Sequence, residues 1–231
     1  MRPTGGQSWR LSEGEPWDLH LALFVRDACG LGNVGPVGPL LEPPGFSVEV
    51  AEIDIPEVSN SWQLWWDSLL GSRIVPPIVA AATMPEQLLV RAQQRTAAAV
   101  PPDFGQLAHS PALSKLPTAA WEEAFLPWWQ RPPSPGATGA DPFIPIDGVR
   151  GQLIAAIHAD RRRTLMREVI ADLERAVGRP LAPFDFEIEL LAVEGVTPVA
   201  QNASRAVVPL GLFRDDDRYR GWLTNSLEPL A

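Results

Sequence analysis

The 231-residue sequence predicts an α+β fold, with two packed lobes built from short sheets and amphipathic helices. Three observations support this fold class. Apolar residues recur every four positions through much of 149–177, which is typical of helices. The segments 184–193 and 205–213 are short and rich in branched and aromatic residues, which is typical of strands. A Pro/Gly-rich stretch at 131–145 separates these elements from an earlier, Trp-rich part of the chain.

The predicted organisation therefore has four parts. Residues 1–16 contain few apolar side chains and several Gly, Ser and Glu residues, so we expect a flexible N-terminal arm. Residues 17–130 form a Trp-rich, mainly helical lobe, 131–147 form the linker, and 148–231 form an α+β lobe. A chain of this length suits two small domains or one large one, so packing of both lobes as one domain stays open.

The first lobe begins with an apolar segment, 17–28. It is either a short buried helix capped by Asp18 or a strand, because periodicity alone does not decide between them. Alternating apolar residues predict a strand at 47–55, which Pro56 ends. Helices are then predicted at 61–71, at 83–99, where a capping box opens the pattern, and at 118–126.

The second lobe contains the most regular helical pattern in the chain. Apolar residues spaced by four predict helices at 149–157 and 165–177, and Gly178 ends the second. The two strands named above follow. A final helix is predicted up to Leu227, because the acidic residues at 215–217 stabilise a helix N-terminus through its dipole.

The segment 61–71 carries three of the nine tryptophans. At 100° per residue, its heavy apolar side chains fall on one arc of a helical wheel. We predict that Trp62, Trp66 and Leu69 lie at the buried centre of this face. Aromatic residues at helical spacing usually belong to a core, so we interpret this cluster as packing rather than as a binding surface.

A second tryptophan pair, Trp128 and Trp129, follows Pro127 at the edge of the linker. Proline disfavours continuation of a helix, and adjacent side chains in extended backbone point to opposite sides. We therefore expect Trp128 to reach the core and Trp129 to stay exposed. Because exposed tryptophan is a natural anchor for a partner, both are candidate partner-binding residues.

The densest positive patch in the chain lies in the segment DRRRTLMRE, which contains Arg161, Arg162, Arg163 and Arg167. If a helix began at Asp160, its first turn would hold three arginines, and the helix dipole disfavours cations there. Two arrangements remove this conflict. Either the helix is continuous from about residue 149, or an acidic partner compensates the charges.

The same arginines have two functional interpretations. The favoured one is a solvated helix face on which they pair with Asp160, Glu168 and Asp172. The alternative is a site for an anionic partner, and it makes the triplet candidate partner-binding residues. The triplet comprises Arg161, Arg162 and Arg163.

The sequence GLGNVG, at 30–35, matches the glycine pattern of dinucleotide-binding folds. That pattern works because a helix starts at the glycines and points its N–H groups at the pyrophosphate. Here prolines at 36, 39, 43 and 44 follow, and they prevent such a helix. We therefore predict a plain Gly/Pro loop that binds no nucleotide.

Residues that commonly carry catalysis or metals are few. The histidines, His20, His109 and His158, form no zinc-protease motif, and no G-x-S-x-G sequence is present. Cys29 next to an apolar segment favours a small core residue over a nucleophile paired with His20. We predict no metal site and no cofactor.

The overall charge disfavours two classes of partner. The formal net charge is −9 and the isoelectric point is about 4.8, so phosphate backbones and anionic lipids repel the chain. No apolar run approaches the roughly 20 residues that span a bilayer, and no signal peptide is visible. We predict a cytoplasmic protein, and the bias towards Arg, Ala, Gly and Pro indicates a GC-rich bacterial genome.

These observations favour a non-catalytic protein-interaction or assembly subunit of a cytosolic bacterial multi-protein system, whose partner is another protein. The alternative is an enzyme or small-molecule sensor with a site built from scattered Asp, Glu and Arg residues. A deep polar pocket with buried carboxylates would favour the alternative. A flat patch rimmed by Trp and Arg would favour docking.

Overall fold

The computed structural model describes residues 9–32, 34–45, 47, 55–74, 118–129 and 148–230. The helix predicted at 83–99 and the linker at 131–147 lie outside these residues. The chain forms two compact units. The helical unit comprises 16–35 and 43–128, and the sheet unit comprises 1–15, 36–42 and 129–231. Helices and a mixed sheet together confirm the predicted α+β class.

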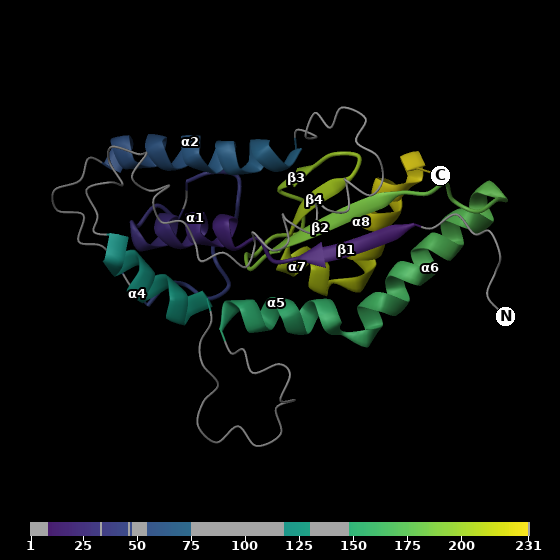
Figure 1. Cartoon of the computed structure of the whole chain (residues 1–231), viewed down its shortest axis with the longest axis horizontal. Coiled ribbons are helices and arrows are strands. Elements are labelled where there is room, and N and C mark those ends of the chain that lie inside the picture. The colour runs from purple at the N-terminus through teal and green to yellow at the C-terminus, as the bar shows by residue number, and fades with distance from the viewer. Residues whose placement is uncertain are drawn as a thin grey trace, which may run out of the picture. The chain divides into compact units, whose positions relative to one another are not determined.

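The sheet of the sheet unit has the strand order β1-β2-β4-β3 (Figure 1). β1 runs parallel to β2, β2 parallel to β4, and β3 antiparallel to β4. Four strands are described: β1 (Arg10–Gly14), β2 (Asp185–Leu191), β3 (Ala200–Gln201) and β4 (Arg205–Pro209).

The prediction of a flexible arm at 1–16 is wrong for the part that forms the first strand, and residues 1–8 lie outside the described residues. Residues 10–14 form β1 at the edge of the sheet, and the Arg10 N–H donates to the Phe184 carbonyl at 2.8 Å. β1 is held by main-chain pairing with β2, a segment far along the sequence, as Figure 1 shows. Its modest apolar content gave no sign of this pairing.

The two faces of the sheet differ in polarity. Paired residues of parallel strands lie on one face, so Glu13 shares a face with Ile188 and Ala206. Helix α8 (Asp216–Leu227) packs on this face, where the Trp222 ring lies 6.5 Å from that of Phe186. All β2 and β4 residues on the face are apolar: Phe186, Ile188, Leu190, Ala206 and Val208. Glu13 is therefore a carboxyl group beside apolar residues of β2 and β4, and the polar Gln201 of β3 lies on the same face.

The helices of the sheet unit follow the predicted pattern closely. They are α5 (Val149–His158), α6 (Asp160–Val177), α7 (Leu210–Arg214), α8 and a short 3-10 helix, η3 (Glu228–Leu230). Gly178, with φ of 71°, ends α6, and the Asp215 side chain caps α8 by accepting the Arg218 N–H at 3.1 Å. The strand predicted at 205–213 is wrong beyond Pro209, where α7 begins. A short apolar run does not distinguish strand from helix.

The helical unit contains α1 (Trp17–Ala28), α2 (Ile55–Ile74) and, up to Trp128, α4 (Thr118–Trp129). α1 settles the open choice at 17–28 in favour of a helix. Asp18 lies in its first turn rather than at the cap, and its carboxylate accepts from Arg73 of α2 at 2.5 Å. Of the strand predicted at 47–55, residues 48–54 lie outside the described residues, and Ile55 begins α2.

The tryptophans of α2 form a core, as predicted. The rings of Trp62 and Trp66 are fully buried and stack with centroids 5.5 Å apart. The Trp62 Nε1–H donates to the Ala22 carbonyl of α1 at 2.6 Å, which satisfies its polar atom. The prediction for Leu69 is wrong, because Leu69 is half-buried and its neighbour Leu70 is buried instead.

Candidate functional site

The predicted exposure of Trp129 is wrong. Trp128 is 6% exposed and Trp129 is 3% exposed. The physical reason is that α4 continues through Pro127 to Trp129, so positions 125, 128 and 129 share one helical face. Within the helical unit, the Trp128 ring lies 5.2 Å from that of Phe24 and 5.6 Å from that of Phe125. This tryptophan pair therefore presents no exposed docking patch.

The glycine motif lies in a loop that follows a helix. α1 ends at Ala28, and Gly30 and Gly35 have positive φ angles of 71° and 87°. No helix begins between residues 34 and 45 in the part of the chain that the structure describes there. The strand–loop–helix context that gives the pattern its phosphate-binding geometry is thus missing from these residues.

The arginine triplet occupies the first turn of α6. Ala159, with φ of −60° and ψ of 123°, separates α5 from α6, so the helix is not continuous from residue 149. The prediction of a continuous helix is therefore wrong, and within the sheet unit Asp216 at the start of α8 compensates part of the arginine charge. Arg162 Nη2 lies 2.6 Å from Asp216 Oδ1, and the Arg161 guanidinium contacts Oδ2 of the same carboxylate.

The partners predicted for these arginines are corrected accordingly. Glu168 and Asp172 pair with Arg220 of α8, and Asp172 also pairs with Arg175. Packing of α8 along α6 brings these groups together, whereas the prediction considered pairs within one helix only. The structure does not describe the side chain of Asp160.

The three predicted arginines differ sharply in accessibility. Arg162 is 7% exposed, while the side chain of Arg161 is 79% exposed and that of Arg163 is also exposed. The Arg162 guanidinium lies 4.9 Å from the centroid of the Phe213 ring and 5.2 Å from that of Tyr219. These cation–π contacts replace part of its lost hydration. Arg162 therefore faces the interior of the sheet unit.

Around Arg162, three buried polar atoms have no hydrogen-bond partner. They are the Nη1 of Arg162, the Oδ2 of Asp216, which contacts the Arg161 guanidinium as an ion pair, and the hydroxyl of Tyr219, a fully buried residue of α8. An unpaired buried donor costs roughly 1–3 kcal/mol, so such atoms are uncommon in folded proteins. The cluster is polar, buried and incompletely satisfied.

Glu13 of β1 completes this cluster. Burial raises its pKa to about 7, although the charges of Arg163 and Arg162 act in the opposite direction. Burial likewise raises the pKa of Tyr219 well above its usual value, and the charge of Glu13 adds to the rise. A carboxyl group that titrates near neutral pH is typical of functional sites, although buried ion-pair networks produce it too.

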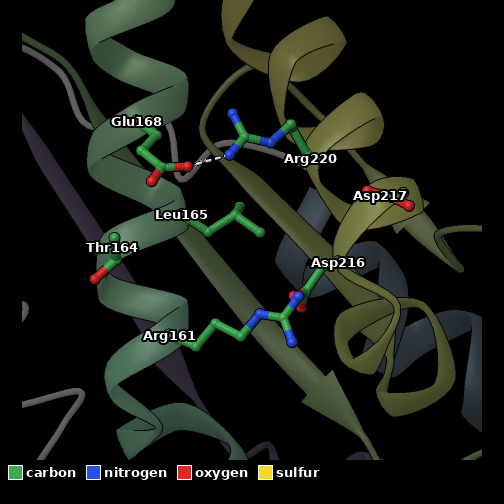
Figure 2. Close-up of a pocket in the computed structure, with 7 residues that line it drawn as sticks. All are labelled: Arg161, Thr164, Leu165, Glu168, Asp216, Asp217 and Arg220. Carbon is green, nitrogen blue, oxygen red and sulfur yellow. Dashed lines mark hydrogen bonds and ion pairs between the residues drawn. The ribbon is translucent and has the colours of Figure 1, made fainter.

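Next to the cluster, α6 and α8 enclose a hollow of about 190 Å³ (Figure 2). Two ion pairs bridge the helices at its ends, Arg161 with Asp216 and Arg220 with Glu168. The polar groups of the hollow are thus mostly paired with one another. Seven residues line it: Arg161, Thr164, Leu165, Glu168, Asp216, Asp217 and Arg220.

On another side of α6, Arg163 and Arg167 are both exposed. Their spacing of four places them on one helical face, which we call the arginine face. Arg163 Nη2 lies 3.2 Å from His158 Nδ1. Among the described residues, Arg167 makes no ion pair. Among the described residues, neither arginine of this face forms an ion pair with a carboxylate, although the charge of Arg163 also acts on Glu13.

The remaining nucleophilic and metal-binding candidates are buried or outside the described residues. Cys29 is buried, and burial raises its pKa to about 11, so the thiol stays protonated. Burial lowers the pKa of His20 to about 4, and its Nδ1 lies 2.8 Å from the Pro16 carbonyl oxygen. His109 lies outside the described residues. The described part of the chain contains no group of three metal-binding side chains.

Local sequence patterns did not identify Glu13, Asp216 and Tyr219 as members of the cluster. Asp216 was recognised only as a favourable charge at a helix N-terminus. Glu13 carried one weak signal, its position two residues after apolar Leu11.

No described helix is long and apolar enough to cross a membrane.

Comparison with known proteins gave no match among family models, curated proteins or solved structures.

Proposed function

We propose that the protein is a non-catalytic interaction subunit of a cytosolic bacterial multi-protein system, and that its arginine face binds an acidic surface on a partner protein. The observation that carries this proposal is Arg167. It is exposed on α6, lies one turn from exposed Arg163, and makes no ion pair with any described residue.

The chemistry of arginine supports an acidic protein as the partner. Arginine presents a planar fork of donors that matches carboxylates, and it is enriched at the energetic centres of interfaces. The chain as a whole has a net charge of −9 and repels an acidic partner. A local positive patch attracts that partner, so it determines where and in which orientation the partner binds. The same net charge disfavours nucleic acid and anionic membranes as partners.

The rival function is an enzyme or small-molecule sensor, and one observation favours it. Glu13 titrates near neutral pH beside Arg162 and Tyr219, as acid–base groups of active sites do. Against it, the unpaired atoms of Arg162 and Tyr219 are covered by protein. The charged groups that line the neighbouring hollow are largely paired with one another. We therefore favour docking.

Affinity capture from extracts of the native host tests the proposal. The immobilised proteins are the wild type, the double variant Arg163→Glu/Arg167→Glu, and the control Arg175→Glu. Arg175 is a matched control because it is an exposed arginine of the same helix, but it pairs with Asp172.

We expect one partner to be retained by the wild type and by Arg175→Glu, and lost by the double variant. Equal capture by all three proteins would refute the arginine face as the docking surface. Specific turnover of a small molecule, with no partner retained, would establish the rival function instead.

A further inference from the structure

The outer edge of β1 carries main-chain groups that point away from the sheet. β1 is the outermost strand (Figure 1), and it pairs in parallel with β2 on its inner side. The Arg10 N–H donates to the Phe184 carbonyl just before β2. Main-chain groups of a strand alternate between its two sides, so the N–H and C=O groups of Leu11 and Glu13 point outward.

These outward groups are unpaired. None of them forms a hydrogen bond with any residue that the structure describes. Arg10 is exposed and the other residues of β1 are half-buried, so the strand is not sealed from solvent. β1 contains no proline, the residue that would remove an outward donor. Such an edge is a template for a further strand.

We propose that β1 pairs antiparallel with β1 of a second copy of this chain, across a twofold axis at Ser12, so that the two sheets join into one. In this register, Leu11 of each copy lies opposite Glu13 of the other. Each of the two Leu11–Glu13 pairs exchanges two main-chain hydrogen bonds. Every outward group of both strands therefore gains a partner.

Neighbouring registers satisfy fewer of these groups. A twofold axis at Glu13 would place the two Glu13 side chains directly opposite each other, where like charges repel. An axis at Leu11 would pair Glu13 with Trp9, which lies before the strand. Only an axis at Ser12 uses both outward residues of both copies within β1.

The side chains at this register favour a second copy as the occupant of the edge. Arg10 is exposed and makes no ion pair with a described residue. It would lie opposite Gly14 of the second copy, where a Cβ would meet no described atom within 4 Å. Beyond Gly14, Glu189 of β2 lies at the paired position on the same face. Arg10 therefore extends over Gly14 toward the Glu189 carboxylate of the second copy, and twofold symmetry repeats the contact.

The strand pair is short, so we expect a monomer–dimer equilibrium rather than a permanent dimer. β1 has five residues. Stable protein interfaces bury about 1,200–2,000 Å² in total, which a strand pair of this length does not reach by itself. The inference concerns this chain alone, so it is independent of the docking of an acidic partner on the arginine face.

Disulfide cross-linking of the full chain tests the register. In the proposed dimer the two Ser12 residues form a non-hydrogen-bonded pair, with Cα atoms about 4.5 Å apart. A disulfide needs Cα atoms about 4.4–6.8 Å apart, so Ser12→Cys should cross-link on mild oxidation with copper phenanthroline. Arg10 and Gly14 each lie about 13 Å from their own counterparts, but opposite each other. The native Cys29 is buried, and the wild type measures its background.

We expect Ser12→Cys to form the covalent dimer at least tenfold faster than Arg10→Cys or Gly14→Cys alone. A mixture of Arg10→Cys and Gly14→Cys should form a mixed dimer that neither variant forms by itself. Equal cross-linking of all the variants, or no cross-linking of Ser12→Cys, overturns the proposal.

Sedimentation equilibrium measures the association without a cross-link, from about 10 µM to about 1 mM. Leu11→Pro removes an outward N–H and no bond to β2, whereas Leu11→Ala shortens the same side chain but keeps the N–H. We expect Leu11→Pro to weaken dimerisation at least tenfold and Leu11→Ala to stay within about threefold of the wild type. Equal dissociation constants for the two variants overturn the proposal. So does a wild type that stays monomeric throughout, which would leave the edge to a strand of a different protein.

Discussion

Arg162 and Asp216 join the first turns of two helices, with 2.6 Å between Nη2 and Oδ1. The arginine follows the start of α6 by two residues, and the aspartate begins α8. Negative charge stabilises a helix N-terminus, whereas positive charge destabilises it. Asp216 therefore stabilises the start of α8, and it also compensates the arginine charges in the first turn of α6. In this ion pair, the Arg162 side chain is buried and the Asp216 side chain is largely buried.

Removal of Asp216 should destabilise the protein strongly. Asp216→Ala leaves the buried guanidinium of Arg162 without its carboxylate, and such losses cost about 3–5 kcal/mol. The exposed neighbour supplies the control, because Asp217→Ala should stay within about 0.5 kcal/mol of wild type. Urea unfolding measures both values. A similar free energy of unfolding for the two variants would show that the Arg162–Asp216 pair contributes little.

The stability of the wild type should fall as the pH rises from about 4.5 to about 7. Glu13 has a pKa near 7 in the folded chain against about 4.5 ordinarily, so the folded state binds more protons in this window. Glu13→Gln cannot ionise, and it should lose this part of the pH dependence. Thermal melts at pH 5 and pH 8 measure the effect. The variant should gain on the wild type at pH 8, and an equal difference at both values would contradict the assignment.

The core role of the α2 tryptophans is tested by truncation. Trp66→Ala removes a fully buried ring that stacks on Trp62, and large core truncations cost about 3–5 kcal/mol. Leu64 lies on the same helix with 73% exposure, so Leu64→Ala should change the free energy of unfolding by less than about 0.5 kcal/mol. If Trp66→Ala melts like Leu64→Ala, the tryptophan is not a core residue.

Local patterns predicted much of the fold correctly. Four-residue spacing identified α6, and the acidic residues at 215–217 identified the start of α8. β1 was missed because its order comes from hydrogen bonds to distant β2, which no local pattern reports. Trp129 was misplaced because Pro127 was expected to end the helix. A proline removes one hydrogen bond but keeps a helical φ angle, and α4 continues past it.

The candidate site was predictable only in part. The arginine triplet and the electrostatic conflict of its position could be read from consecutive residues. The acid that resolves the conflict could not, since Asp216 lies far along the chain and meets Arg162 only when α8 packs against α6. The same holds for Glu13, whose neutral-range titration depends on its burial on the helix-covered face of the sheet.

Docking through the arginine face is tested most directly by the affinity of the captured partner for single variants. Isothermal titration of the purified partner compares the wild type with Arg167→Glu and Arg175→Glu. We predict that Arg167→Glu weakens binding by about tenfold or more, roughly 1.4 kcal/mol, and that the loss shrinks as salt is added. Arg175→Glu should bind within about twofold of wild type. Equal dissociation constants for the two variants would contradict the proposed function.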